Sequence, residues 1–244
     1  MGKAVIMQPT FLPWLGYFDL IDQADVFVFL DNVQFEKQSW QQRNKIRTPN
    51  GLEWVTIPVL IKGRFGQVIK DVEINKSVLF DKFIKQVRHN YSRAEYFTKF
   101  FEEFASVFEN AYNRGNLCDF NIAIIEWLSL KLSISHVFLR SSQLKASGKR
   151  SELLVNILKE LGSVYYISPA GSAVYLDQEY DLFENENISV FYQNYDHPQY
   201  PQVYKPFVAY ASCLDLLFNA GEKSMDIVRS GRRELVAAKK GIVA

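Results

Sequence analysis

The stretch from Met7 to Leu30 constrains the fold more than any other part of the chain. A short apolar run, residues 4–7, ends at a loop with two prolines and a glycine, and a brief stretch with helical spacing leads to a second apolar run, residues 26–30. Strand, loop, helix and strand in this order are typical of the first half of a parallel α/β unit. The sequence therefore predicts an α/β fold with a parallel sheet.

Each of these two strands is followed by a polar residue, Gln8 after the first and Asp31 after the second. In parallel sheets the carboxyl ends of neighbouring strands face a shared crevice where ligands bind. Gln8 and Asp31 are therefore candidate site residues. The alternative is that both are polar strand ends in ordinary turns.

The rest of the chain indicates one domain over residues 1–244, with two additions to the parallel sheet. Within residues 52–75, Trp54–Val59 and Val68–Ile74 are expected to pair as a hairpin, and residues 76–132 are expected to form a helical insertion with a dense aromatic stripe. Further strands are predicted near residues 137–140, 164–167 and 188–192, and further helices over residues 151–161, 207–219 and 223–239.

Composition excludes several classes of protein. The net charge of the 244 residues is +1, which is too low for a protein that mainly binds nucleic acid. No apolar run approaches the roughly 18 residues of a membrane span, and the first run is too short for a signal peptide, so a cytoplasmic protein is expected. Cys118 and Cys213 are expected to be small buried hydrophobic residues. The three histidines lack ligand spacing, so neither a metal site nor a cofactor is predicted.

The segment Asn32–Asn50 is long, polar and rich in aromatic and cationic residues. Long loops of this kind are commonly functional, and arginine and amide side chains suit recognition of a phosphate, a sugar or a carboxylate. The alternative is a solvated cationic loop. The candidate binding residues in the segment are Gln34, Trp40, Arg43, Asn44 and Lys45.

A second polar loop with aromatic residues, Gln193–Gln202, contains His197, Tyr200 and Gln202. His197 is a candidate for proton transfer because the ordinary pKa of an imidazole suits acid–base chemistry at neutral pH. Lys149 lies at the predicted start of a helix, between Ser147 and Ser151, where free backbone N–H groups suit an anion. A helix cap with a solvated lysine is the alternative there.

Several long motifs resemble the WbqC-like family. They read QPTFLPWLGYFDLIDQAD, FLDNVQF, SWQQRNKI, QNYDHPQYPQ and SCLDLLFNAG, and they occur in order from Val5 to about Gly221. The family is found among genes of bacterial polysaccharide and O-antigen biosynthesis, and a role as a glycine or aminoacyl transferase acting on an amino sugar has been suggested for it. Polar and aromatic residues in the matching motifs include most of the candidates above, together with Asn219.

The first strand, loop and helix are also similar to the start of the nucleotidylyltransferase superfamily, whose signature is H-x-G-H. Trp14-Leu15-Gly16-Tyr17 occupies those four places, so Gly16 agrees and both histidines are replaced. The resemblance implies a Rossmann-like (nucleotidylyltransferase-like) sheet. It does not support adenylyl transfer by the usual mechanism, because neither Trp nor Tyr can donate a proton as imidazolium does.

The resemblance to the WbqC-like family, together with the polar loops at the strand ends, implies a transferase of surface-polysaccharide biosynthesis. It would pass an aminoacyl group, glycyl among them, or an acyl group to a nucleotide-linked amino sugar. The expected partners are that sugar nucleotide and an activated acyl or amino-acid donor, and a homo-oligomer is left open. The expected roles are phosphate binding by Arg43, Lys45 and Lys149, stacking by Trp14, Trp40 and Tyr200, and proton abstraction by Asp31 or His197 in a cleft shared with Arg43.

Two alternatives remain at this point. The first is a nucleotide-dependent ligase or nucleotidyltransferase with altered catalytic residues. The second is a non-catalytic nucleotide-sugar-binding or scaffold protein of a glycan assembly complex.

Overall fold

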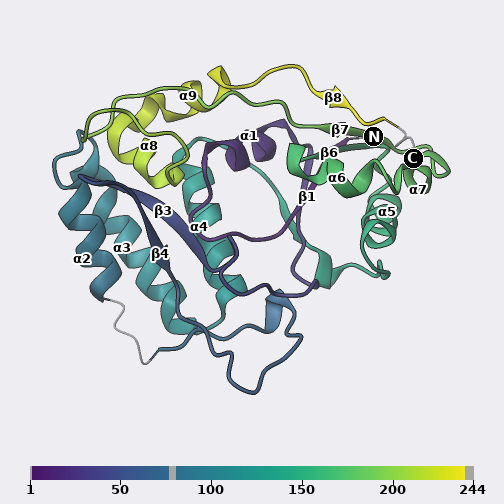
Figure 1. Cartoon of the computed structure of the whole chain (residues 1–244), viewed down its shortest axis with the longest axis horizontal. Coiled ribbons are helices and arrows are strands. Elements are labelled where there is room, and N and C mark those ends of the chain that lie inside the picture. The colour runs from purple at the N-terminus through teal and green to yellow at the C-terminus, as the bar shows by residue number, and fades with distance from the viewer. Residues whose placement is uncertain (1, 77–80, 240–244) are drawn as a thin grey trace.

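The computed structural model describes residues 2–76 and 81–239, and its centre is a six-stranded sheet with the strand order β5-β2-β1-β6-β7-β8 (Figure 1). The first five strands in this order are parallel, and β8 is antiparallel to β7. The predicted α/β class with a parallel sheet is therefore confirmed. The strands are β1 (Lys3–Met7), β2 (Val26–Phe29), β5 (Phe138–Arg140), β6 (Tyr165–Ser168), β7 (Ser189–Tyr192) and β8 (Val236–Ala237).

β1 lies at the point where the strand order reverses. From β1 the chain first adds β2 and β5 on one side, and later adds β6 and β7 on the other. Ligands of open α/β sheets bind outside the carboxyl ends of the strands at such a reversal. The end of β1 at Met7 and the end of β6 at Ser168 are therefore where the fold itself favours a site.

Helix α1 (Leu15–Gln23) connects β1 to β2, as the sequence predicts. It begins directly after Pro13 and Trp14, and its residues Leu15 to Ile21 are all buried. After the helix, the N–H group of Asp25 donates a hydrogen bond to the carbonyl oxygen of Lys3, at 2.8 Å. This bond sets the register in which β2 pairs with β1.

The two faces of the sheet are covered by different helices, because side chains alternate along each strand. Ala4 and Ile6 of β1 pack in a core with α5 (Ser151–Glu160), α6 (Ala173–Leu176) and α7 (Tyr180–Glu184). Val5 faces the larger core, with α1 and the helices of the insertion. In Figure 1 the helices α5 and α7 lie on the right and α2 and α3 on the left, with β1 between them.

The helical insertion predicted over residues 76–132 is confirmed for its described part; residues 77–80 lie outside the described residues. It contains α2 (Asp81–Tyr91), α3 (Phe97–Arg114) and α4 (Leu117–Lys131). Gly115 ends α3 with a left-handed φ of 85°, the conformation in which glycine commonly caps a helix. The aromatic stripe of α3 is core, as expected, and Phe108 packs edge-on against Phe120 of α4 with ring centroids 4.8 Å apart.

The hairpin differs from the predicted one. Its strands are β3 (Arg43–Thr48) and β4 (Gly51–Thr56), so the partner of the Trp54 strand precedes it in the chain. Residues 68–74 instead form a short 3-10 turn, Ile69–Asp71, and three single bridges, and one of these, between Ile74 and Val59, lies within the predicted pairing. An appended hairpin is thus confirmed, but its first strand was not predicted, because residues 43–48 are too polar to resemble a strand, although Asn44, Ile46 and Arg47 are buried.

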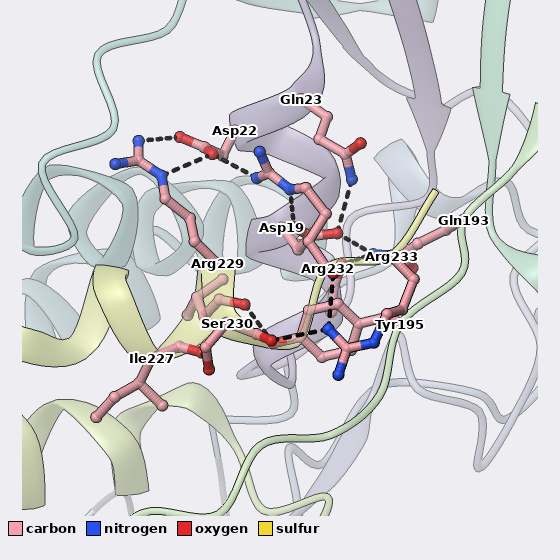
Figure 2. A network of polar contacts seen from close by, with 12 residues as sticks. Asp19, Asp22, Gln23, Gln193, Tyr195, Ile227, Arg229, Ser230, Arg232 and Arg233 are labelled. Carbon is pink, nitrogen blue, oxygen red and sulfur yellow. Dashed lines mark hydrogen bonds and ion pairs between the residues drawn. The ribbon is translucent and has the colours of Figure 1, made fainter. Parts of the chain in front are cut away.

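The carboxyl-terminal part contains α8 (Cys213–Ala220) and α9 (Ser224–Ser230), and the helix predicted to continue to residue 239 ends at Ser230. The chain then turns back along β7. Two arginines that follow α9 form ion pairs with other segments: Arg232 pairs with Asp19 and Asp22, and Arg233 pairs with Asp196. Figure 2 shows Arg232 between Asp19 and Asp22 of α1, with Arg229 on the outer side of Asp22. Asp19 also accepts a hydrogen bond from Gln193, at the end of β7, at 2.7 Å.

Cys118 and Cys213 are both buried and free, as expected. Among the described residues, no helix combines the length and the apolar character that crossing a bilayer requires.

Candidate functional site

Two pockets share lining residues at the carboxyl end of β1, one on each face of the sheet. The first, which we call the sheet-edge pocket, has a volume of about 220 Å³ and is on the α5 side. The second, the aromatic pocket, has a volume of about 450 Å³ and is on the α1 side. Met7 and Thr10 line both pockets. The two pockets are therefore neighbours, with Met7 and Thr10 in the wall that they share.

The sheet-edge pocket lies at the reversal of the strand order. Gln8 follows β1 directly, and Pro169 and Ser172 belong to the segment that follows β6. The exposed Tyr175 of α6 is at its rim. Its complete lining is Ile6, Met7, Gln8, Thr10, Leu30, Leu154, Tyr166, Pro169, Ser172 and Tyr175.

The aromatic pocket combines flat apolar rings with one cation. Trp40 is 52% exposed and Tyr210 is 59% exposed, and both line the pocket. Lys45 of β3 lies in the same wall. Aromatic faces beside a cation suit a ligand with a planar ring and an anionic group. The complete lining is Met7, Thr10, Pro13, Trp14, Tyr17, Trp40, Asn44, Lys45 and Tyr210.

Asn44 is the residue that fixes the hairpin against the loop after β1. It is 3% exposed, and its amide nitrogen donates hydrogen bonds to the carbonyl oxygens of Phe11 and Leu12, at 3.0 and 2.7 Å. The next strand residue, Lys45, accepts a bond from the N–H group of Ser212 through its own carbonyl oxygen, at 3.0 Å. The pocket wall is thus held by contacts between three distant segments.

The cationic groups of Arg43 and Lys45 both lie over the indole ring of Trp54. The guanidinium carbon of Arg43 is 4.3 Å from the ring centroid of Trp54, the Nζ atom of Lys45 is 4.8 Å from it, and Trp40 packs against the same ring at 5.2 Å. Within the described residues, no ion pair links either cation to a carboxylate. Two like charges on one face of a strand repel each other, so an anion at this place would be stabilised.

Both ring nitrogens of His197 are occupied within the protein. Its Nδ1 atom is 2.9 Å from the carbonyl oxygen of Pro198, and its Nε2 atom accepts a hydrogen bond from the N–H group of Tyr210, at 3.1 Å. The ring also stacks on Trp14, with centroids 6.1 Å apart. Burial lowers the pKa of His197, so the neutral ring is favoured. In this geometry His197 holds the wall of the aromatic pocket and does not line it.

The carboxylate of Asp31 is also engaged in hydrogen bonds within the protein. Its side chain is buried and accepts hydrogen bonds from the hydroxyl groups of Ser141 and Ser142 and from the N–H group of Ser142, at 3.0, 2.8 and 2.8 Å. These bonds connect the end of β2 to the end of β5. Leu30, its neighbour, lines the sheet-edge pocket, but Asp31 itself is directed into the protein.

Tyr200 and Gln202 surround a buried carboxylate that the sequence analysis did not single out. The hydroxyl group of Tyr200 and the amide of Gln202 donate to the same oxygen of Asp215, at 2.7 and 2.8 Å. Burial raises the pKa of Asp215 to about 6, and the hydrogen bonds from Tyr200, Gln202 and Tyr91 oppose that shift. Tyr200 and Gln202 are both 5% exposed, so their contacts are with this cluster.

Of the twelve residues predicted to form a site, the structure brings five to the two pockets: Gln8, Trp14, Trp40, Asn44 and Lys45. Arg43 lies beside them, packed on the ring of Trp54. Four other predicted residues do not line the pockets and instead support their walls from within the protein: Asp31, His197, Tyr200 and Gln202. Gln34 lies in a separate surface pocket with Phe65, and Lys149 is exposed and lines neither of the two pockets. Thr10 and Tyr210 were not predicted, because neither residue has chemistry or spacing that stands out in the sequence.

Comparison with known proteins finds similarity over most of the chain. Residues 8–227 match the model of the WbqC-like protein family. The chain belongs to this family. An uncharacterized protein of Mycobacterium tuberculosis, Rv1507c, is 32% identical over 234 residues, which is 96% of this chain and 100% of the relative. No solved structure matches the chain.

In this WbqC-like protein, Trp14, Gly16 and Tyr17 make structural contacts at the start of α1. Trp14 precedes α1 and its ring covers Gly16, where an added Cβ atom would come within 2.4 Å of the indole. Tyr17 is buried, and its hydroxyl group donates to the carbonyl oxygen of Gln8, at 3.1 Å. The glycine at this place is therefore explained by contact with Trp14.

Proposed function

We propose that this WbqC-like protein is a transferase of surface-polysaccharide biosynthesis that passes an aminoacyl group, such as glycyl, or another acyl group to a nucleotide-linked amino sugar. The observation that carries the proposal is the pair of neighbouring pockets whose linings share Met7 and Thr10. A transfer reaction needs two ligands whose reacting atoms touch. Two adjacent pockets at the reversal of a parallel sheet supply that arrangement.

The aromatic pocket is the better place for the nucleotide. Its Trp14, Trp40 and Tyr210 rings can contact a base, while Lys45, with Arg43 behind it, offers positive charge to a diphosphate. The sugar would then extend past Thr10 toward the sheet-edge pocket. Gln8, Ser172 and Tyr175 provide hydrogen-bonding groups there for the sugar or for the acyl donor.

The chemistry proposed is aminolysis of an activated acyl group such as a thioester. The amine of the sugar attacks the carbonyl carbon, the new C–N bond forms, the C–S bond breaks, and the proton lost by the amine ends on the departing thiolate. The products are an amide and a thiol, so no further reactant is required.

The residues that line the pockets favour catalysis by holding the two reactants in proximity and orientation. Among the described lining residues of the two pockets there is no carboxylate and no imidazole, and the titratable side chains are tyrosines and Lys45. Holding two reactants in contact can by itself account for a large part of a rate enhancement. Asp31 and His197, the bases expected from the sequence, contribute in this proposal by holding the walls.

The test is to incubate the purified protein with nucleotide-linked amino sugars and with aminoacyl and acyl thioesters, and to search for the amide product by mass spectrometry. Product should form with the wild-type protein. The variant Thr10→Tyr, which places a larger side chain where the pockets meet, should lose at least about 90% of the activity because the reactants are separated. The control Thr56→Tyr, on the exposed side of β4, should retain it.

Other results of the same experiments would support a different function. ATP–pyrophosphate exchange without amide formation would support a nucleotide-dependent ligase or nucleotidyltransferase. Binding of sugar nucleotides without any turnover across the panel would support a binding or scaffold protein. Either result would overturn the proposed transfer reaction.

A further inference from the structure

Tyr210 has a backbone conformation that its own side chain does not explain. Its φ angle is 65°, in the left-handed region that residues other than glycine, asparagine and aspartate rarely adopt. Leu12, near the same pocket, also has a positive φ of 44°, but its side chain is completely buried, which offsets the strain. The Tyr210 side chain is 59% exposed and gains much less from burial. Strained residues of this kind concentrate at functional sites.

The surroundings hold Tyr210 in this conformation. Its N–H group donates to Nε2 of His197, at 3.1 Å, and its ring lies edge-on to the imidazole, with centroids 4.9 Å apart. On the pocket side, the same ring contacts Trp14, with centroids 5.5 Å apart. The imidazole is in turn packed against Tyr200 and Phe207. The fold thus fixes an exposed aromatic ring at the edge of the aromatic pocket.

We propose that Tyr210 stacks on the base of the bound nucleotide and that His197 is the positioning residue that holds it there. The inference rests on the proposed function and assigns the nucleotide end of the substrate to the aromatic pocket. A planar base is favoured because the pocket presents several ring faces, and Lys45 lies in the same wall to meet a phosphate. Every base has such a face, so stacking here would tolerate several nucleotides.

The test uses Tyr210→Gly, because glycine adopts a φ of 65° without strain. The variant should unfold at the same temperature as the wild type or higher, and yet bind nucleotide about 10- to 100-fold more weakly, since a stacked base is lost. Tyr210→Phe keeps the ring and should bind within about threefold of the wild type. The probes are UDP, dTDP, GDP and CDP, measured by titration calorimetry.

A matched control separates strain from recognition. Ser133 is exposed, has a φ of 58° and lines neither pocket, so Ser133→Gly relieves comparable strain elsewhere. It should leave nucleotide affinity unchanged. A merely structural role for Tyr210 cannot give higher stability together with weaker binding.

His197 is tested through the Tyr210 amide. In His197→Ala the Tyr210 N–H group loses its acceptor, so its hydrogen exchange should become faster and nucleotide binding should weaken. In His197→Gln a side-chain oxygen can accept the same bond, and protection and affinity should both recover in part. Unchanged exchange and affinity in His197→Ala would overturn the positioning role.

The outcomes distinguish this inference from the proposed function. If the wild type binds a diphosphate and Tyr210→Gly binds it equally well, the inference is overturned and the transfer reaction stands. If Tyr210→Gly loses binding but no amide product is ever formed, the inference stands and the transfer reaction fails. If the wild type binds none of the four probes, the stacking role is overturned.

Discussion

Replacing Arg232 with alanine should destabilise the protein strongly, although this arginine lies on the last segment of the fold. Figure 2 shows its side chain between two carboxylates of α1. Its Nε atom donates to Asp19, at 2.7 Å, and a terminal nitrogen pairs with Asp22. Asp19 is completely buried, and its remaining partners are the amides of Gln23 and Gln193.

The magnitude follows from the burial of Asp19. Removing one member of a buried ion pair costs about 3–5 kcal/mol, because the other charge stays buried without its partner. The Arg232 side chain is 31% exposed and Asp19 keeps two amide donors, so a cost at or just below the lower limit of this range, about 2–3 kcal/mol, is expected. For a domain of this size that corresponds to a fall of about 5–10 °C in Tm.

Arg229 supplies the control, since it pairs with Asp22 at 2.6 Å on the outer side of the same network. Its side chain is 53% exposed, and Asp22 keeps Arg232 when it is removed. Exposed ion pairs contribute at most about 1 kcal/mol, so Arg229→Ala should lower Tm by only a few degrees.

The assay is urea unfolding followed by circular dichroism, with thermal unfolding as a second measurement. Asp19→Asn combined with Arg232→Ala removes both charges and should be less damaging than the sum of the two single changes. If Arg232→Ala and Arg229→Ala were equally mild, the network would not hold the terminal segment, and the reasoning from burial would be refuted.

Three further predictions concern the site and its supports. Asp31→Ala leaves the donors of Ser141 and Ser142 without their acceptor and should lower the free energy of unfolding by about 2–4 kcal/mol in urea, and a loss below about 0.5 kcal/mol would contradict its role as the tie between β2 and β5. The raised pKa of Asp215 means that the folded state keeps a proton which the unfolded chain releases, so its contribution to stability falls as pH rises from about 4 to about 6, on the order of 3 kcal/mol. Asp215→Asn should remove this part of the pH dependence, measured as the difference between wild type and variant in urea midpoints from pH 4 to pH 7; parallel curves would show that Asp215 does not titrate in this window. Trp40→Ala should weaken nucleotide binding about tenfold with little change in Tm, whereas Phe65→Ala, which changes an exposed ring outside both pockets, should affect neither, and equal effects of the two changes would argue against the aromatic pocket.

The parallel sheet could be predicted from the sequence because its strands are apolar and lie between recognisable turns and helices. The position of Gln8 at the carboxyl edge follows from the same pattern, and the structure places it in the sheet-edge pocket. The polar segment after Asp31 was expected to carry binding residues, and three of the candidates, Trp40, Asn44 and Lys45, line the aromatic pocket.

What could not be predicted depends on contacts between distant segments. The strand character of β3 comes from pairing with β4 and from burial of polar side chains such as Asn44, whose partners are carbonyl oxygens after β1. In the same way, Tyr200 and Gln202 look like binding residues until Asp215, on the following helix, is seen between them. Local composition contains no information about such partners.

For the site itself, Tyr210 shows how far prediction from the sequence can go. Nothing in its sequence neighbourhood indicates a left-handed backbone, because a glycine or asparagine would be the usual signal for one. Its role becomes visible only when the His197 acceptor and the Trp14 ring are placed beside it.

The most direct test of the account is a crystal structure of the protein soaked with a nucleotide-linked amino sugar such as UDP-glucosamine. We predict electron density in the two pockets on either side of Met7 and Thr10, with the base against Tyr210, the diphosphate near Lys45 and the sugar toward Gln8. Ordered ligand at another place, or empty pockets in crystals soaked at a ligand concentration that saturates binding in solution, would contradict this prediction.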